Sequence, residues 1–344
     1  EDDKPSVFAR TGVLAAEILA WGDIGTTMSL PGPGLATPAV RTMGSPEIQE
    51  MFFSSFDVEE PRWGAFALTE PGAGSDVARI RATARKEGDY YIINGEKTFI
   101  TNGARAMWNV VFATVDPSLG RDGHRAFLVK KGTEGFRVGR IEDKMGIHAS
   151  ETAGLVFEDC KVHKDFLLGG EEYYSKKAGF KGAMETFNAS RPMVAAMSIG
   201  VARAAYEYTR DYLKETYMLS RPTALYRKLK EILDTMKRKL DVAMLLCIKA
   251  SWMIDIKKPN AKEAAMAKAY APPVSLWTAS KCVELLGEEG TLEYHQLVEK
   301  CYRDLKVFDI FEGTGQVQRI IVSRKLFAEQ GKPATLTPSE RQIS

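Results

Sequence analysis

The sequence is poor in cysteine, in long apolar runs and in any excess of one charge, and each shortage excludes a class of protein. No apolar run approaches the roughly 18 residues that a membrane-spanning helix needs, so we expect no transmembrane segment. Lysine and arginine total 47 against 45 aspartate and glutamate, a net charge of +2, which excludes a strongly basic nucleic-acid-binding protein. C-x-x-C spacing is missing too, as is typical of reduced, mostly buried thiols in the cytosol or an organelle matrix; the cysteines are Cys160, Cys247, Cys282 and Cys301.

Histidine is also scarce, and its spacing does not favour a metal site. Neither i, i+4 pairing nor carboxylate–histidine spacing occurs among His124, His148, His163 and His295. The charged start, residues 1–5, has no signal-peptide apolar core. We therefore expect no bound metal and a cytoplasmic protein, or one of the mitochondrial matrix if the source is eukaryotic.

Periodicity divides the 344 residues into three segments. Helical spacing is found in residues 1–62, a two-residue period in 63–168, and helical spacing again in 169–344. The pattern predicts an α+β multidomain protein with a short N-terminal helical domain, a middle antiparallel β-domain and a C-terminal helical bundle.

Within the first segment, Leu14, Ile18 and Trp21 fall at i, i+4 and i+7 and predict the apolar face of a helix. The Pro31-Gly32-Pro33-Gly34 stretch breaks that helix, since proline removes a hydrogen-bond donor and glycine frees the backbone. The helical signal resumes toward Phe52.

In the middle segment, Asn94-Gly95 predicts a two-residue hairpin turn, because this dipeptide tolerates positive φ. Strands are expected on either side of the turn. Further strands are expected at residues 109–115, 125–130 and 154–162, each bounded by glycine, proline or aspartate.

Two segments carry residues suited to chemistry. The first, Leu68–Asp76, is a glycine-rich turn whose backbone N–H groups and hydroxyls can approach a planar or anionic ligand, although a plain hairpin loop fits its spacing equally well. The second, Phe308–Arg319, places Glu312 before Gly-Thr-Gly in an apolar setting. Such a setting raises the pKa of a carboxyl toward the range of a general base; the alternative is a solvated helix-terminal glutamate.

Together with a third segment, these motifs resemble the acyl-CoA dehydrogenase family. TEPGAGSD at 69–76 resembles that family's flavin and substrate loop, ITNG at 100–103 its second flavin-binding strand, and FEGTGQVQR at 311–319 its base-bearing segment. The resemblance runs from about Leu14 to Phe327 and implies the family's fold: an N-terminal helical domain, a middle β-domain and a C-terminal four-helix bundle, with FAD as the cofactor.

The resemblance implies a reaction and a base. In the family, a carboxylate removes the α-proton of an acyl-CoA thioester while the β-hydrogen leaves as hydride to flavin N5, and Glu312 matches that carboxylate. Some members carry the base at the position of Ser190, where serine cannot serve. The resemblance assigns stabilisation of the enolate oxygen to the backbone N–H of Glu312 and a ribityl hydroxyl of FAD.

Further roles follow from the same resemblance. The FAD-binding positions are Phe66, Leu68, Thr69, Ser75, Phe99, Ile100, Thr101, Arg227, Thr314 and Gln316. The acyl-CoA positions are Ser75, Ser150, Asn188, Arg191, Gly313 and Arg324. For Arg324 alone, a solvated helix charge is an equal alternative.

Some positions depart from the family pattern. Thr216 replaces an arginine that reaches a neighbouring subunit's FAD in homotetrameric members, and Glu284 replaces a glutamine. Pro272-Pro273 interrupts a segment that the family keeps helical, and we expect it to kink or split that helix. The family also has about sixty more residues before the helix near Val13, so we expect either an abbreviated head or a sequence that lacks its beginning.

The expected activity is FAD-dependent α,β-dehydrogenation of an acyl-CoA thioester in fatty acid or lipid catabolism, of the β-oxidation type. Electrons would pass to electron-transfer flavoprotein, in a homo- or hetero-tetramer with no nucleic-acid partner. Two alternatives stay open: an acyl-CoA oxidase that uses O₂, and a non-catalytic partner subunit of a heteromeric dehydrogenase. The altered positions favour a base-bearing subunit of the heteromeric kind.

Overall fold

The computed structural model describes residues 6–175, 179–216 and 224–331. Helices at both ends of the chain and a β-sheet between them confirm the α+β prediction. Within the described residues, every helix is too short or too polar to cross a membrane. All four cysteines are buried and unpaired, as their spacing predicted.

The chain folds into two compact units. The helical unit comprises residues 1–27, 145–147 and everything from 187 onward. The sheet unit comprises residues 28–144 and 148–186.

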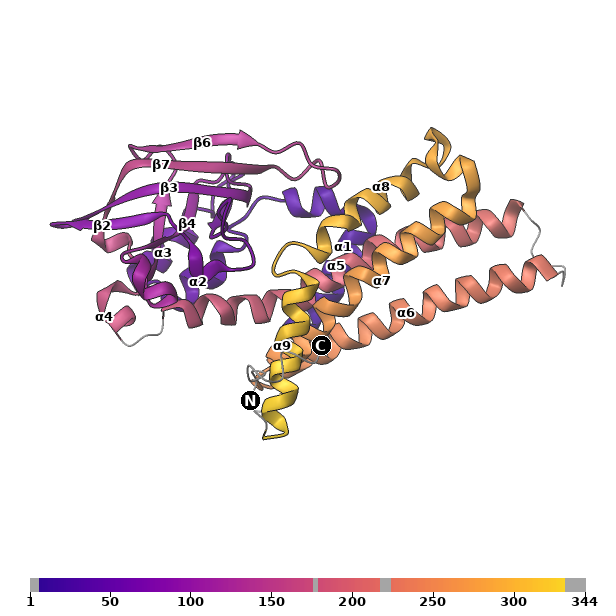
Figure 1. Cartoon of the computed structure of the whole chain (residues 1–344). Helices are drawn as coiled ribbons and strands as arrows, with labels where there is room; N and C mark the ends of the chain where they lie inside the picture. The colour runs from indigo at the N-terminus through magenta and orange to yellow at the C-terminus, as the bar shows by residue number, and fades with distance from the viewer. Residues whose placement is uncertain (1–5, 176–178, 217–223, 332–344) are drawn as a thin grey trace. The chain divides into compact units, whose positions relative to one another are not determined.

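The sheet unit is built on a seven-stranded sheet (Figure 1). The strands are β1 Gly64–Ala67, β2 Thr83–Glu87, β3 Tyr90–Thr101, β4 Trp108–Thr114, β5 His124–Lys130, β6 Phe136–Ile141 and β7 Thr152–His163. They lie in the order β1-β4-β2-β3-β7-β6, and β5 pairs with β4. Pairing is antiparallel except that β4 runs parallel to β1 and β2, which corrects the purely antiparallel prediction. Short helices complete the unit: α2 Ala36–Met43, α3 Pro46–Ser54 and α4 Gly170–Ser175.

The predicted hairpin turn at Asn94-Gly95 is wrong, because both residues lie inside β3. The turn between β2 and β3 is at Gly88, whose φ of 58° is left-handed. Gly95 instead marks a register shift against β7. A Cβ on Gly95 would lie 2.6 Å from the Cα of Ala82, so this glycine allows the close approach of β3 to the residue just before β2.

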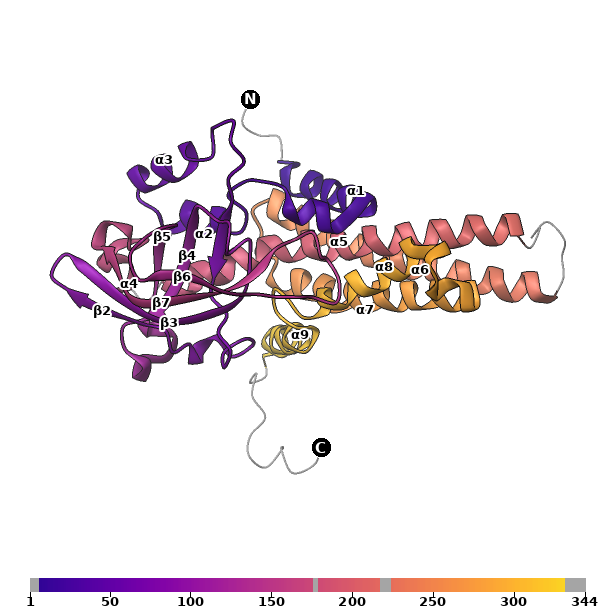
Figure 2. The same cartoon turned by 90° about the horizontal axis from the view of Figure 1, so that it is seen from above.

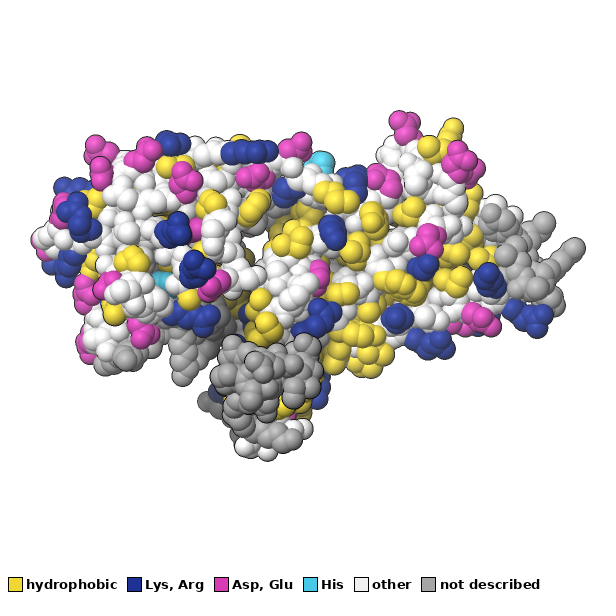
Figure 3. Space-filling view, in the orientation of Figure 1, with side chains coloured by type: hydrophobic (Ala, Val, Ile, Leu, Met, Phe, Trp, Pro, Cys, Tyr) yellow, Lys and Arg dark blue, Asp and Glu magenta, His cyan; other side chains and the backbone are white. Residues whose placement is uncertain are grey.

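The helical unit contains long helices that run side by side (Figure 2). They are α1 Phe8–Ser29, α5 Gly179–Thr216, α6 Ala224–Asp255 and α7 Ala261–Leu286, followed by α8 Gln296–Leu305 and α9 Gly315–Glu329. Helix α7 packs against α6, α8 and α9. Figure 3 shows hydrophobic side chains gathered on the visible face of this unit, and exposed apolar residues of α6 and α9 include Leu245, Trp252, Leu326 and Phe327.

The apolar face predicted for the first helix is wrong. Leu14, Ile18 and Trp21 are 46%, 58% and 44% exposed. The contact between α1 and α5 uses small residues, since a Cβ on Gly200 would lie 2.1 Å from the carbonyl oxygen of Glu17. Close backbone approach therefore selects a narrower face, which consists of Val13, Ala16, Ala20 and Ile24.

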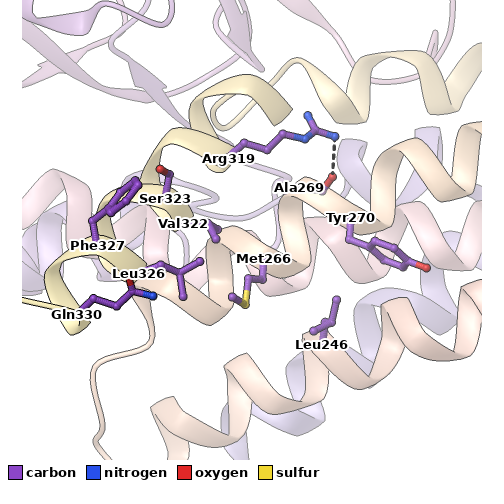
Figure 4. Close-up of a pocket in the computed structure, with 10 residues that line it drawn as sticks. All are labelled: Leu246, Met266, Ala269, Tyr270, Arg319, Val322, Ser323, Leu326, Phe327 and Gln330. Carbon is purple, nitrogen blue, oxygen red and sulfur yellow. Dashed lines mark hydrogen bonds between the residues drawn. The ribbon is translucent and has the colours of Figure 1, made fainter. Parts of the chain in front are cut away.

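The prediction that Pro272-Pro273 kinks or splits its helix is wrong as to a split, because α7 continues through both prolines. Pro273 has no N–H to donate to the carbonyl of Ala269, four residues earlier. Arg319 of α9 supplies a donor instead, with its Nη2 3.4 Å from that oxygen (Figure 4). A side chain from a neighbouring helix thus replaces one lost helical hydrogen bond.

Candidate active site

Glu312 lies in a strained turn that connects a 3-10 helix, Lys306–Asp309, to α9. Glu312 and Gly313 have φ values of 53° and 93°, both left-handed. For a glutamate this conformation costs about 1–2 kcal/mol, so the surroundings must hold it. Thr314 then caps α9, because its Oγ1 accepts a hydrogen bond from the N–H of Val317 at 3.3 Å.

The carboxyl of Glu312 has one hydroxyl partner. Ser190 Oγ donates to Glu312 Oε2 at 2.8 Å. As a residue Glu312 is half-buried, yet protein surrounds its carboxyl closely enough that burial raises the pKa of the group. The Ser190 hydrogen bond and the charges of Lys268 and Arg191 oppose this rise without cancelling it. A carboxylate held in this way is suited to accept a proton.

A second buried charge lies next to the turn. Lys268 of α7 is fully buried, and its Nζ donates to the carbonyl of Phe308 at 2.5 Å and to that of Gly313 at 3.4 Å. Burial lowers the pKa of Lys268 to about 8, while Glu312 and Asp309 act in the opposite direction. The backbone of the turn is therefore hydrogen-bonded to the ammonium group of a lysine in the neighbouring helix α7.

Two further buried side chains of this region each have one polar atom without a hydrogen-bond partner among the described residues. Arg191 is 6% exposed; its Nη1 donates to Asn188 Oδ1 at 2.8 Å, but its Nε has no hydrogen-bond partner among the described residues. Gln318 is fully buried; its Nε2 donates to the carbonyl of Gly313 at 3.2 Å, and its Oε1 likewise lacks a partner in the described chain. Unpartnered buried groups are costly unless a bound molecule completes them.

The structure thus brings together five residues singled out from the sequence, all in the helical unit: Ser190, Asn188, Arg191, Glu312 and Gly313. Ser190, set aside as a base, hydrogen-bonds the carboxyl that replaces it. Sequence reasoning missed Lys268 and Gln318. A charged residue among the alanines of α7 was the available signal for Lys268, and the motif itself contained Gln318.

The positions predicted to bind the flavin ring belong to the sheet unit and form two adjacent segments. One runs from Phe66 in β1 to Ser75, and the other is the end of β3, Phe99–Thr101. The N–H of Thr98 donates to the carbonyl of Thr69 at 2.9 Å and joins the two. Leu68 and Ile100, one in each of these two segments, have buried side chains, and we call the exposed side of the two segments the flavin surface.

The residues of this surface fit a flavin ring. Phe99 is 63% exposed and has a left-handed φ of 56°, at a register shift in β3. Strained residues and bulges of this kind are common at ligand sites. The same two segments carry the exposed Phe99 side chain and the hydroxyls of Thr69, Ser75 and Thr101, which are groups suited to the flat ring and polar edge of an isoalloxazine.

A buried ion pair supports the first of these segments. Lys97 Nζ lies 2.7 Å from Glu70 Oε1 and donates to the carbonyl of Leu68 at 3.1 Å. The Glu70 carboxylate also accepts the backbone N–H groups of Arg81 and Ala82 at 2.6 and 3.0 Å. Burial lowers the pKa of Lys97 to about 8, and Glu70 opposes that change.

Ser150 has the features of a ligand contact in the sheet unit. It is 1% exposed, and its Oγ has no partner within the described residues. Its backbone is fixed, since its carbonyl accepts a hydrogen bond from Lys144 Nζ at 2.6 Å. The acyl-CoA contact assigned to Ser150 from the sequence stays a prediction.

The remaining predicted positions lie at surfaces of the helical unit. Arg227 of α6 is exposed, as are Gln316 and Arg324 of α9. Thr216 is exposed at the last residue of α5. Glu284 forms an ion pair with Lys281, three residues earlier on α7.

A cavity of about 660 Å³ opens between α6, α7 and α9 (Figure 4). Its lining is mainly apolar, and Figure 4 shows Leu246, Met266 and Leu326 pointing toward one another. Of the positions assigned from the sequence to base, FAD or substrate, none is among the ten residues lining this cavity. The cavity is therefore separate from the proposed chemistry.

Two family models match the chain. The model of the acyl-CoA dehydrogenase middle domain matches residues 65–160, and that of the acyl-CoA dehydrogenase C-terminal domain matches residues 177–327.

Individual proteins agree with these matches. A 3-(aryl)acrylate reductase of Clostridium sporogenes is 36% identical over 307 residues, which cover 89% of this chain and 79% of that protein. Butyryl-CoA dehydrogenase from Megasphaera elsdenii is similar in structure, with a TM-score of 0.84 and 36% identity over 92% of this chain and 81% of its own. A chain in a structure described as the electron transferring flavoprotein of Acidaminococcus fermentans has a TM-score of 0.83 and 40% identity, covering 91% of this chain and 81% of that one.

Proposed function

The chain belongs to the acyl-CoA dehydrogenase family of flavoprotein oxidoreductases, and we propose that it removes hydrogen from the α and β carbons of an acyl-CoA thioester with Glu312 as the base. The observation that carries the proposal is the Glu312 carboxyl, which lies in a strained turn and accepts a hydrogen bond from the Ser190 hydroxyl. Burial raises the pKa of this carboxyl, as proton abstraction from a weakly acidic carbon requires.

In this proposal, the backbone of the turn and side chains of α5 bind and orient the thioester. The backbone N–H of Glu312 donates to the thioester oxygen as negative charge develops on it. Asn188 orients the Arg191 guanidinium, which is assigned to a polar group of the acyl-CoA.

The same proposal covers FAD. FAD, when bound, supplies the acceptor for the β-hydride. Hydroxyls of Thr69, Ser75 and Thr101 and the ring of Phe99 hold its tricyclic end, supported by the Glu70–Lys97 ion pair. The positions assigned to the rest of the cofactor are Phe66, Leu68, Ile100, Arg227, Thr314 and Gln316.

We propose electron-transfer flavoprotein as the redox partner, supported by the likeness to a chain in the electron transferring flavoprotein structure. A reductase at 36% identity favours a second candidate, the reverse reaction on an α,β-unsaturated thioester. Assays in both directions, with and without electron-transfer flavoprotein and with peroxide detection, separate dehydrogenase, reductase and oxidase.

Organisation and assembly are part of the proposal. We assign residues 1–62, 63–168 and 169–344 to the N-terminal, middle and C-terminal domains, which the matched ranges 65–160 and 177–327 support. A homo- or hetero-tetramer is supported by the exposed apolar residues of α6 and α9. Unpaired buried cysteines support a cytoplasmic or mitochondrial-matrix location. One FAD per chain in the protein purified alone would contradict the heteromer.

Replacing the base tests the function directly. Glu312→Gln keeps the size of the side chain but cannot accept the proton, so we expect kcat for a thioester to fall by about 10³-fold or more. Glu329→Gln, which removes an exposed carboxylate of α9, is the control and is expected to keep wild-type kcat. Normal dehydrogenation by Glu312→Gln would remove the basis for the assignment.

A further inference from the structure

The ammonium of Lys268 occupies an unusual place for a lysine. The side chain is fully buried, and its neighbours on α7 are Ala264, Ala265, Ala267 and Ala271, which are also buried. A buried charge is costly unless hydrogen bonds compensate it. Here two backbone carbonyls compensate it, those of Phe308 and Gly313.

These two carbonyls bracket the base. Phe308 precedes Glu312 by four residues, and Gly313 follows it directly. The ring of Phe311 also lies near the ammonium, with its centroid 5.9 Å from Nζ. One atom on a rigid helix therefore fixes both ends of the turn that carries the base.

The turn needs such a support. Glu312 and Gly313 are consecutive left-handed residues, and a glutamate keeps that conformation only where contacts enforce it. The Gly313 carbonyl receives a second donor, Gln318 Nε2 at 3.2 Å. A Cβ on Gly315 would lie 2.3 Å from Asp309 Oδ1, so the chain has little room to relax.

The charged groups around Glu312 come from several elements. Lys268 of α7 and Arg191 of α5 favour its ionised form. Asp309, in the same segment, acts on Lys268. Ser190 of α5 is the hydrogen-bond donor to the carboxyl. Lys268 thus combines a mechanical role with an electrostatic one.

We infer that Lys268 is a positioning residue for the Glu312 base: it holds the turn in the left-handed conformation and supplies positive charge to the carboxylate. The inference rests on the proposed function, since it concerns the same base. Lys268 contacts the base-bearing backbone through carbonyl oxygens, and it acts on the reaction through Glu312.

Lys268→Met removes both the hydrogen bonds and the charge. We expect kcat to fall by about 10²-fold, because a base displaced by about 1 Å loses that much, while KM changes by less than about threefold. Exchange of the α-hydrogen of the thioester for deuterium, measured by NMR, slows in parallel. The acidic limb of the pH profile of kcat/KM moves upward by about 1 unit, since loss of a nearby cation makes the carboxylate harder to form.

Lys262→Met, six residues earlier on α7, is the matched control and should keep wild-type kcat, exchange and pH limb. If Lys268→Met does not fold, Lys268→Gln is measured instead, because its amide keeps hydrogen-bond donors but carries no charge. An upward shift of the acidic limb in Lys268→Gln supports the inference, and an unchanged acidic limb overturns it. Wild-type exchange and limb in Lys268→Met would overturn it as well.

Glu312→Gln, measured in the same experiment, separates this inference from the proposed function. Loss of α-hydrogen exchange in Glu312→Gln with wild-type behaviour in Lys268→Met overturns the inference alone. Undiminished exchange in Glu312→Gln overturns both.

Discussion

Lys97 and Lys268 are both fully buried, one in each unit, but they donate to different acceptors. In the sheet unit, the ammonium of Lys97 meets a carboxylate, that of Glu70. In the helical unit, the ammonium of Lys268 meets backbone carbonyls on either side of Glu312. A lysine and a glutamate therefore form a direct ion pair in the sheet unit, whereas in the helical unit the lysine contacts the backbone that carries the glutamate.

The difference lies in how far each carboxylate is satisfied. Glu70 accepts two backbone N–H groups and an ammonium, which together compensate its charge. Glu312 accepts one hydroxyl, and burial keeps its pKa raised. A saturated carboxylate fixes a loop, whereas an undersatisfied one retains affinity for a proton.

Removing the cation from the saturated pair gives the largest effect on stability. We expect Lys97→Met to lower the free energy of unfolding by about 3–5 kcal/mol, because Glu70 is left as a buried charge without its counter-ion. Urea unfolding measures the loss.

Two further variants sharpen this result. Adding Glu70→Gln to Lys97→Met should recover part of the loss, since the orphaned charge is then removed. The exposed Lys161→Met of β7 should change stability by less than about 0.5 kcal/mol. A loss below about 1 kcal/mol for Lys97→Met would contradict the structural role of the pair.

The next largest effect is expected from a substitution in the turn around Glu312. Gly313→Ala places a Cβ 2.4 Å from Gln318 Nε2 at a φ of 93°, so we expect a loss of about 1–3 kcal/mol in stability and about tenfold in kcat. Gly22→Ala in α1, where an added Cβ meets nothing within 4 Å, is the control. A Gly313→Ala protein as stable and active as wild type would show that the turn is not strained.

The sequence predicted the strands better than it predicted packing. Strands at 109–115, 125–130 and 154–162 are confirmed within one or two residues, because strand-forming residues and the glycine, proline or aspartate that bounds them are local properties of the chain. The Glu312 motif could be found for a similar reason, since its glycines and hydroxyls are contiguous.

The errors concern properties that depend on a distant segment. Which face of α1 is buried depends on Gly200, far along the chain. Asn94-Gly95 has the composition of a turn, but Gly95 is required by the approach of Ala82. Helix α7 continues through its prolines, and the donor to one of the two carbonyls affected, that of Ala269, comes from Arg319 of α9.

Neutralising the undersatisfied carboxylate should stabilise the fold slightly. The pKa of Glu312 in the folded protein is raised above its ordinary value of 4.5, so the folded state favours the protonated carboxyl. This contribution to the free energy of unfolding is fully present below pH 4.5, and it is lost as the pH rises through the folded pKa. Glu312→Gln lacks this loss, and we expect it to be about 1 kcal/mol more stable than wild type at about pH 8, with a smaller gain at about pH 5. Thermal unfolding at both pH values measures the gain, and equal gains would show that the carboxyl titrates normally.

The smallest effect concerns the bond that replaces a lost helical donor. Arg319→Gln removes the guanidinium from the Ala269 carbonyl, and we expect a cost of about 0.5–1 kcal/mol in wild type. In a Pro273→Ala background the cost should be lower by about 0.5 kcal/mol, because a backbone N–H now serves that carbonyl. Pro272→Ala is the matched control. Its restored N–H donates to the backbone carbonyl of Lys268 and not to that of Ala269. Equal coupling of Arg319 to both prolines would mean that Arg319 stabilises the helix through its charge and not through this one oxygen.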